Sequence, residues 1–114
     1  MVLKEYISID KLINEGNQEY PDRIKFCIDK KRRVVAIDEA MHIDMENELF
    51  DDGSNQEDIY GGDIIIKNAP DYTIQWESHP NIEQNRKMGN GNGRLLTDAR
   101  LIDELFDILK YWVR

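Results

Sequence analysis

The stretch RIKFCIDKKRRVVAID, residues 23–38, decides the fold predicted for this chain. Over residues 23–29 apolar and polar residues alternate, and the large apolar side chains fall on one face, which is typical of a half-buried strand. Residues 29–32 form a polar turn, and the apolar residues that follow, within 33–38, predict a returning strand. The stretch therefore predicts an antiparallel hairpin.

A second hairpin and three helices are predicted around the first one. Residues 63–67 and 72–77 predict two further strands joined by a turn. Ser8 caps a short helix that ends at Gly16, residues 41–50 form a short acidic helix, and Thr97 caps a strongly amphipathic C-terminal helix. We therefore expect a single α+β domain over residues 1–114, in the order α-β-β-α-β-β-α. It should have about four antiparallel strands, with the helices packed on one face of the sheet.

The charge of the chain is strongly acidic and uneven. The formal net charge is −8 over 114 residues, so generic binding to nucleic acid or to an anionic membrane is not expected. Residues 34–66 hold ten acidic residues and no Lys or Arg. Repulsion among these acids must be relieved by solvent, by a bound cation or by basic residues elsewhere in the chain.

Cysteine content and hydropathy indicate in which compartment the protein is expected. Cys27 is the single cysteine, which excludes an intramolecular disulfide and a cysteine-based zinc site. Its place in an apolar run is typical of a half-buried strand thiol. The N-terminus has no apolar signal region, and no window approaches the length of a membrane span. We expect a cytoplasmic protein that does not enter a membrane.

The densest polar segment is GSNQEDIYGG, residues 53–62. Ser54 and Glu57 have the spacing of a capping box, which would explain both residues structurally. Gln56 and Asp58 have no such explanation and are candidates for acid–base chemistry. The two glycines that end the segment permit unusual backbone angles or close approach of a ligand, or only a bend into the next strand.

A basic loop at residues 85–94 follows later in the chain. Its alternating Gly and Asn residues allow positive φ angles and can aim backbone amides at an anion. Arg86, Asn92 and Arg94 are the candidate anion-binding residues there. The loop has neither the ending of a Walker motif nor the setting of a dinucleotide fingerprint, so the sequence favours a flexible solvated loop over an anion site.

The two histidines, His42 and His79, each have acidic residues nearby in sequence. Metal ligation or acid–base work would suit them, and His42 joins the candidate catalytic residues. However, no metal-binding spacing is present and the EF-hand pattern fails. We therefore predict no metal site and no cofactor.

Three stretches resemble a family of small prokaryotic proteins known only as a domain of unknown function. They are MHID at 41–44, DDGSNQEDIYG at 51–61, and a looser part from Ser78 through Asn81-Ile82 to GNGR at 91–94. The family is similar in carrying an Asp-Gly-Ser-x-Gln-Glu-Asp-Leu-Trp-Gly-like motif, and the resemblance covers roughly residues 23–112. Carried over position by position, it singles out polar and glycine residues: His42, Ser54, Gln56, Glu57, Asp58, Gly61, Asn81, Asn92 and Arg94.

The resemblance implies no activity. Tyr60 stands where the family tends to have Trp, and Arg86 competes with Arg94 as the counterpart of the family arginine. What it implies is that the acidic turn and the basic loop occur together. We therefore expect a loop arginine to meet Glu57 and Asp58, bidentately in the way arginine engages carboxylates.

Three functions fit these features. We expect an interaction or regulatory module that presents an acidic surface to a basic protein partner, and a homo-oligomer is left open. The first alternative is a small enzyme acting on an anionic substrate, with Gln56, Glu57 and Asp58 for acid–base work and Arg86 or Arg94 for the anion. The second alternative is a DNA-mimic inhibitor.

Overall fold

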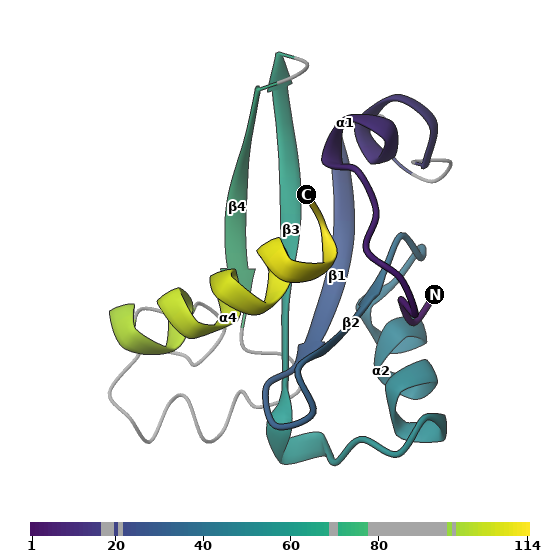
Figure 1. The fold of residues 1–114 in the computed structure, drawn as a ribbon, viewed down its shortest axis with the longest axis vertical. Coiled ribbons are helices and arrows are strands. Elements are labelled where there is room, and N and C mark those ends of the chain that lie inside the picture. The colour runs from purple at the N-terminus through teal and green to yellow at the C-terminus, as the bar shows by residue number, and fades with distance from the viewer. Residues whose placement is uncertain (17–19, 21, 69–70, 78–95, 97) are drawn as a thin grey trace.

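The computed structural model describes residues 1–16, 20, 22–68, 71–77, 96 and 98–114. Its elements follow the predicted order (Figure 1). They are α1 (Ile9–Lys11), the π-helical turn η1 (Leu12–Gly16), β1 (Arg23–Asp29), β2 (Val34–Ile37), α2 (His42–Asp51), the 3₁₀ turn η2 (Gln56–Asp58), β3 (Ile59–Asn68), β4 (Asp71–Glu77) and α4 (Ala99–Trp112). The α+β class is confirmed, and β1 occupies the residues predicted for it.

The four strands form one antiparallel sheet in the order β2-β1-β3-β4. The two predicted hairpins, β1–β2 and β3–β4, are neighbouring strand pairs in this sheet. β1 pairs with β3 at the centre, so β2 and β3 run in the same direction on either side of β1. The chain must therefore cross β1 between β2 and β3, and α2 lies in that crossing.

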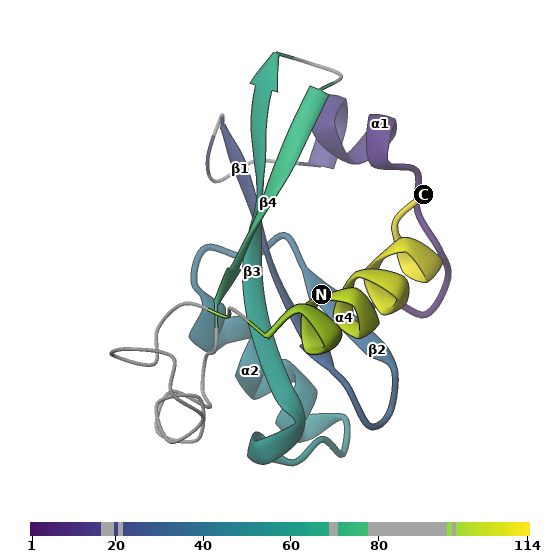
Figure 2. The same cartoon turned by 90° about the vertical axis from the view of Figure 1, so that its left-hand side faces the viewer.

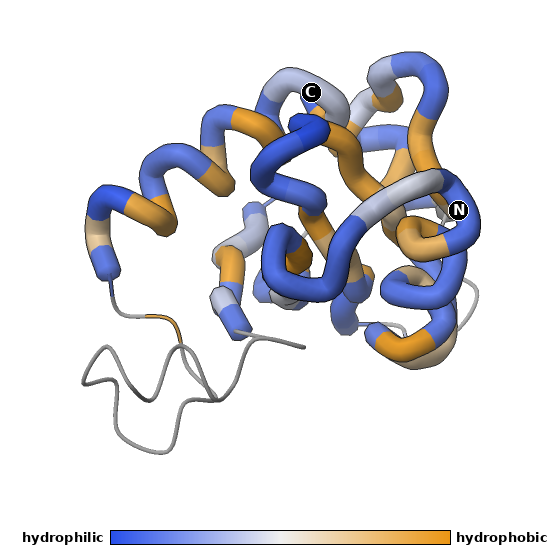
Figure 3. Tube along the Cα trace, turned by 90° about the horizontal axis from the view of Figure 1, so that it is seen from below, coloured by the Kyte–Doolittle hydropathy of each residue, from blue (hydrophilic) through white to orange (hydrophobic). Residues whose placement is uncertain are grey.

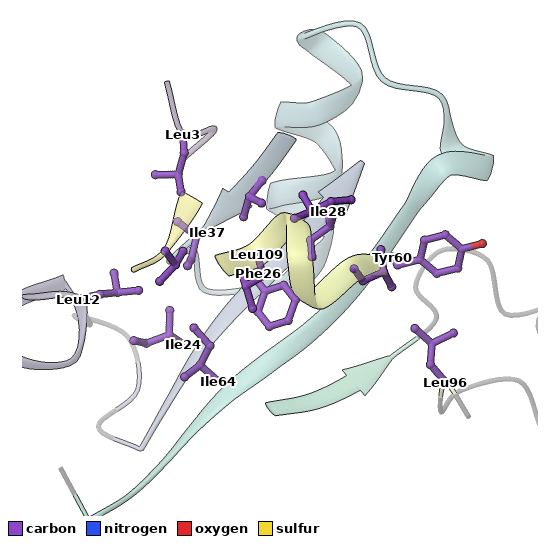
Figure 4. Close-up of a cluster of buried hydrophobic side chains, with 14 residues drawn as sticks. Leu3, Leu12, Ile24, Phe26, Ile28, Ile37, Tyr60, Ile64, Leu96 and Leu109 are labelled. Atoms are coloured by element: carbon purple, nitrogen blue, oxygen red, sulfur yellow. The ribbon is translucent and has the colours of Figure 1, made fainter. Parts of the chain in front are cut away.

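Helices cover both faces of the sheet, not one face as expected. Alternation along β1 directs Ile24, Phe26 and Ile28 to one face, where they pack in a core cluster with residues of α4. Figure 4 shows this core between the strands and α4. Cys27 points to the opposite face and packs in a second cluster with Met45 of α2. α4 and α2 accordingly lie on opposite sides of the sheet (Figure 2).

The C-terminal helix α4 packs through one face against the core cluster that contains Phe26. Leu105, Ile108 and Leu109 are buried there, and apolar and polar residues alternate with the turns of the helix (Figure 3). Its N-cap is Asp98, whose Oδ1 accepts hydrogen bonds from the amides of Arg100 and Leu101. The predicted cap, Thr97, is therefore one residue too early.

β3 begins at Ile59, four residues before the predicted start at Asp63. The reason is that Ile59, Tyr60, Gly61 and Gly62 all pair with β1, which extends the strand back through both glycines. Asp63 thus lies inside a central strand and is buried. Asp63 was predicted as the first residue of this strand, and the structure places it in the interior of the protein.

Gly62 makes room for an aromatic contact on the α4 face. It is paired with Phe26 on one side and Trp76 on the other, and those two rings meet edge to face with centroids 5.4 Å apart. A Cβ atom on Gly62 would come within 2.6 Å of the Phe26 ring and 2.7 Å of the Gln75 carbonyl oxygen. The glycine is therefore needed for packing.

Among the described residues, every helix is too short or too polar to cross a bilayer.

Candidate functional site

A polar cluster lies on the α2 face of the sheet, and we define it as His42, Asp63, Glu77, Lys25 and Arg23. Cross-strand register brings its members together: Lys25 is opposite Asp63, and Glu77 is opposite Gly61, two residues before Asp63. His42 is the first residue of α2, and its side chain extends toward the sheet as far as Asp63. Three strands and one helix therefore contribute to the cluster.

The imidazole of His42 is held between the backbone and two carboxylates. Its Nε2 lies 2.9 Å from the carbonyl oxygen of Gly62 and 3.4 Å from Asp63 Oδ1, and its Nδ1 lies 3.8 Å from Glu77 Oε2. A carbonyl oxygen can only accept a hydrogen bond, so Nε2 carries a proton and donates it to Gly62. Nδ1 faces Glu77.

Asp63 is a buried carboxylate surrounded by cationic groups. Its side chain is 3% exposed, with Lys25 Nζ at 3.6 Å from Oδ1 and Arg23 Nη1 at 3.8 Å from Oδ2. Within the described residues Oδ1 is buried and has no hydrogen-bond partner. Removing a carboxylate from water costs several kcal/mol, which nearby cations offset only in part.

Gly61 allows His42 to approach the sheet. A Cβ atom at this position would lie 3.3 Å from His42 Cδ2 and 3.4 Å from the Phe26 carbonyl oxygen. The position opposite it on β1 is Cys27, and the position opposite on β4 is Glu77. Gly61, singled out by the family resemblance, thus opens a place for His42, which the resemblance singled out as well.

Cys27 lies under the N-terminal end of α2. Its Sγ is 3.8 Å from the His42 carbonyl oxygen. Burial raises the pKa of the thiol well above its ordinary value, and the nearby carboxylates of Glu46, Glu77 and Asp63 raise it further. The thiol is therefore kept protonated, as a packed strand residue would be.

The predicted acid–base residues lie in two elements. His42 is the first residue of α2, whereas Gln56, Glu57 and Asp58 form η2, between α2 and β3. Within the described residues, the side chain of His42 contacts Gly62, Asp63 and Glu77.

Arg32 contacts the segment between α2 and η2. Its Nη1 donates to Ser54 Oγ at 2.8 Å, and its Nη2 lies 2.7 Å from Asp52 Oδ2. The 3₁₀ turn η2 has Asn55, not Ser54, as its N-cap residue. Ser54 is buried, and its hydrogen bond with Arg32 joins the segment after α2 to the connection between β1 and β2.

Several predicted residues lie outside the described residues. They are His79, Asn81, Arg86, Asn92 and Arg94. The expected pairing of Arg86 or Arg94 with Glu57 and Asp58 lies there as well.

Five residues of the observed contacts were missed from the sequence: Arg23, Lys25, Asp63 and Glu77 of the polar cluster, and Arg32. Asp63 interrupts a run of glycine and isoleucine, and a lone carboxylate inside an apolar strand is a usable signal of a buried ion pair. Glu77 and Arg32 gave no local signal, because their contacts depend on the pairing of strands far apart in sequence.

Within the described residues, no three His, Cys, Asp or Glu side chains are arranged to hold a metal ion. The polar cluster consists of two carboxylates, two cationic side chains and an imidazole.

A family model described as "Protein of unknown function (DUF5674)" matches residues 1–110 of the chain. The chain belongs to the DUF5674 family. No match was found among curated proteins or among solved structures. The match confirms membership of a family of unknown function, and its range includes the whole polar cluster of this DUF5674 protein.

Many acids of the 34–66 stretch are paired within the DUF5674 protein. Glu39 and Glu48 lie 2.8 Å and 2.7 Å from the Met1 amino group. Asp52 lies 3.0 Å from Lys4 and 2.7 Å from Arg32, and their hydrogen bonds, with Arg32 the larger cause, hold the pKa of Asp52 below its ordinary value. Basic groups from outside the stretch thus offset part of its charge.

The outer face of α2 is an exposed acidic surface of the DUF5674 protein. Met45, Glu46 and Leu49 turn toward the sheet and are buried. The residues on the opposite side are exposed: Met41, Ile43, Asp44, Asn47 and Asp51. This outer face combines carboxylates with two large apolar side chains.

Proposed function

We propose that this protein is an interaction module whose α2 outer face binds a basic, partly apolar protein segment. The observation that carries the proposal is the exposure of Met41 and Ile43, 54% and 51%, beside the exposed carboxylates of Asp44 and Asp51. Exposed apolar side chains next to exposed charge are typical of binding surfaces.

The polar cluster supports this proposal by holding α2 in place. His42 anchors the first turn of the helix to the backbone of β3 through its hydrogen bond to Gly62. At the other end, Arg32 binds Asp52 and Ser54, which follow the helix. A helix held at both ends presents its outer face rigidly, which lowers the entropy lost on binding.

The pairing of acids favours a protein partner over the DNA-mimic alternative. A duplex mimic needs many free carboxylates on one face, spaced like phosphates. Glu39, Glu48, Asp52 and Asp63 are already paired to groups of the same chain. The exposed acids of α2 are interspersed with apolar residues, which a protein segment can match and a phosphate-binding surface cannot.

The test is affinity capture from the native host with wild-type protein and the double variant Asp44→Asn/Asp51→Asn. Asn retains an oxygen that can accept the hydrogen bond from the Met41 amide to Asp44, so the start of α2 should be kept. The matched control is Asp103→Asn/Asp107→Asn, which changes the net charge equally on exposed positions of α4.

We expect a stoichiometric basic partner that wild type and the α4 control retain and the α2 variant loses, by about tenfold or more in affinity. Equal loss in both variants would mean that only net charge matters. Equal loss in both variants would therefore overturn the proposal. So would unchanged binding in the α2 variant, and so would the absence of any stoichiometric partner.

Acid–base chemistry on an anionic substrate is a second candidate function, favoured by one observation. The buried Asp63 Oδ1 lies 3.4 Å from an imidazole and 3.6 Å from Lys25 Nζ, without a hydrogen-bond partner in the described part of the chain. Buried carboxylate–imidazole pairs are frequent at sites of proton transfer. Lys25 and Arg23 would supply the positive charge that an anion needs.

This second function requires that the polar cluster bind an anion, and inorganic phosphate is the probe. We expect added phosphate to shift the imidazole signals of His42 in NMR spectra, and the shift to disappear in Lys25→Met. Lys67→Met, an exposed lysine on β3, is the control that should keep it. No shift in wild type, or equal loss in both variants, counts against this function.

A further inference from the structure

The C-terminal end of α4 lies beside the segment before α1 (Figure 1), and the two are joined by backbone hydrogen bonds of Ile7. We define the aromatic–arginine surface at this junction as Tyr6, Arg33, Tyr111, Trp112 and Arg114. The guanidinium carbon of Arg114 lies 4.4 Å from the ring centroid of Tyr6 and 5.3 Å from that of Tyr111. Both tyrosines are largely exposed, at 63% and 59%. The guanidinium is thus ordered by two rings that themselves face solvent.

A small cavity opens beside these rings. It measures about 190 Å³ and is lined by Arg33, Ile108, Tyr111 and Trp112. The indole Nε1 of Trp112 donates to the Arg33 carbonyl oxygen at 2.8 Å, which fixes the β1–β2 turn against the helix. Tyr111 stands edge to face with Trp112, with centroids 5.2 Å apart. The walls are therefore held by contacts within the protein before anything binds.

The two arginines have positive charge available for a ligand. Within the described residues, neither Arg33 nor Arg114 forms an ion pair with a carboxylate side chain. The chain as a whole carries a charge of −8. Arg114 Nε donates a hydrogen bond to the Tyr111 carbonyl oxygen at 3.0 Å, which helps to orient the guanidinium without neutralising its charge. The positive charge of the two guanidinium groups is complementary to an acidic ligand and opposite in sign to the charge of the α2 outer face.

We propose that the aromatic–arginine surface binds an acidic peptide segment of a partner protein, with one aromatic or large aliphatic side chain in the cavity and flanking carboxylates on Arg33 and Arg114. The cavity is smaller than the roughly 300–1,000 Å³ typical of cofactor and drug-sized ligand sites. Its size suits a single anchoring side chain, as at the centre of a protein interface. This binding site is independent of the proposed function of α2.

The experiment is an NMR titration that follows the indole N–H signal of Trp112, which reports on the cavity wall. The probe is the peptide Ac-Glu-Asp-Phe-Glu-Asp-NH₂. Two further peptides separate its parts: Ac-Glu-Asp-Ser-Glu-Asp-NH₂ lacks the anchor, and Ac-Gln-Asn-Phe-Gln-Asn-NH₂ lacks the charge. We expect a saturable shift with the first peptide, and binding weaker by about tenfold or more with each of the others.

Arg33→Gln/Arg114→Gln should weaken binding of the first peptide by about tenfold or more. Lys67→Gln/Arg100→Gln removes the same charge from exposed positions elsewhere and should bind as wild type does. The Trp112 signal itself checks that the variant is folded, because its hydrogen bond goes to a backbone carbonyl.

Four results would overturn the proposal. They are no shift with the first peptide, equal binding of the serine peptide, equal binding of the uncharged peptide, and equal weakening in both double variants. Self-association of the protein that Arg33→Gln/Arg114→Gln abolishes, without peptide binding, would assign the surface to a second copy of the chain and also overturn it.

Discussion

Two neighbouring glycines in β3 serve opposite faces of the same sheet. Gly61 leaves room for the His42 ring on the α2 face, and Gly62 leaves room for Phe26 on the α4 face. Neither residue has a positive φ angle, so the reason for glycine at both positions is the space above the strand. Side chains alternate along a strand, and the two positions therefore report on different contacts.

Gly62→Ala should lower the free energy of unfolding by about 1–3 kcal/mol, because its Cβ would overlap the Phe26 ring and a backbone carbonyl that cannot move aside. Gly61→Ala is the matched control. Its closest contact is a histidine ring at 3.3 Å, which can shift by a few tenths of an ångström. Urea unfolding of both variants measures the difference, and a larger loss for Gly61→Ala would contradict this account.

The Cys27 thiol should be unreactive in the native protein. Its pKa is raised by burial and by the carboxylates of Glu46, Glu77 and Asp63, so almost no thiolate is present at pH 8. We expect a disulfide reagent such as Ellman's to react only as fast as the protein unfolds, and rapidly in denaturant. Fast stoichiometric reaction under native conditions would show that the thiol is exposed and ionised.

At the scale of elements, α2 and α4 are amphipathic helices that pack on opposite faces of one sheet. The apolar face of α4 is wide and belongs to the larger core (Figure 4), whereas α2 contributes two large apolar residues to the smaller cluster. α2 therefore depends more on its ends, where His42 and the Arg32 contacts fasten it. Capping should likewise matter for the start of α4.

Asp98→Ala should destabilise the protein by about 1 kcal/mol, since Asp98 accepts from two amides of the first turn of α4. Asp103→Ala, at an exposed position in the same helix, should change stability by less than about 0.5 kcal/mol. Thermal or urea unfolding distinguishes the two. Equal effects would mean that the cap contributes no more than surface charge does.

At the scale of the whole molecule, the acidic stretch is stabilised by cations that come from elsewhere in the chain. Arg32 belongs to the β1–β2 turn and Lys4 to the N-terminal segment, and both bind Asp52 beyond the end of α2. The pKa of Asp52 is lowered by these hydrogen bonds, Arg32 first. The pKa of Glu39 is lowered in the same way, first by the hydrogen bond from the Met1 amino group.

Stability should therefore depend on acid in a defined direction. A carboxyl group with a lowered pKa in the folded state stabilises the fold above its unfolded value, 3.8 for Asp52, and loses that contribution as the pH falls through the folded value. We expect the free energy of unfolding to fall below about pH 4, with a shallower fall in Arg32→Gln. Arg100→Gln is the control, and urea unfolding between about pH 2.5 and pH 7 is the measurement. Identical slopes in all three proteins would contradict the assignment to Asp52.

Local sequence patterns were sufficient to predict four antiparallel strands and the order of helices and strands along the chain, although not the start of β3. Alternation over residues 23–29 is a local pattern, and the observed β1 has those bounds. The helix at residues 42–51 was likewise visible in its spacing of Met45 and Leu49. These features follow from backbone geometry within a few residues, which is why a single sequence reveals them.

Only the tertiary structure decided which faces the helices cover and which charges meet. A pattern of alternation shows that a strand has two faces but not what packs on each, so the expectation of helices on one face was wrong for α2. The same holds for the polar residues: Asp63 was predicted at the start of a strand, and Arg32 in a polar turn. Asp63 meets Lys25 through the pairing of β1 with β3, and Arg32 meets Asp52 and Ser54 because the chain returns past the β1–β2 turn after α2. Contacts between segments so far apart leave no mark in local sequence.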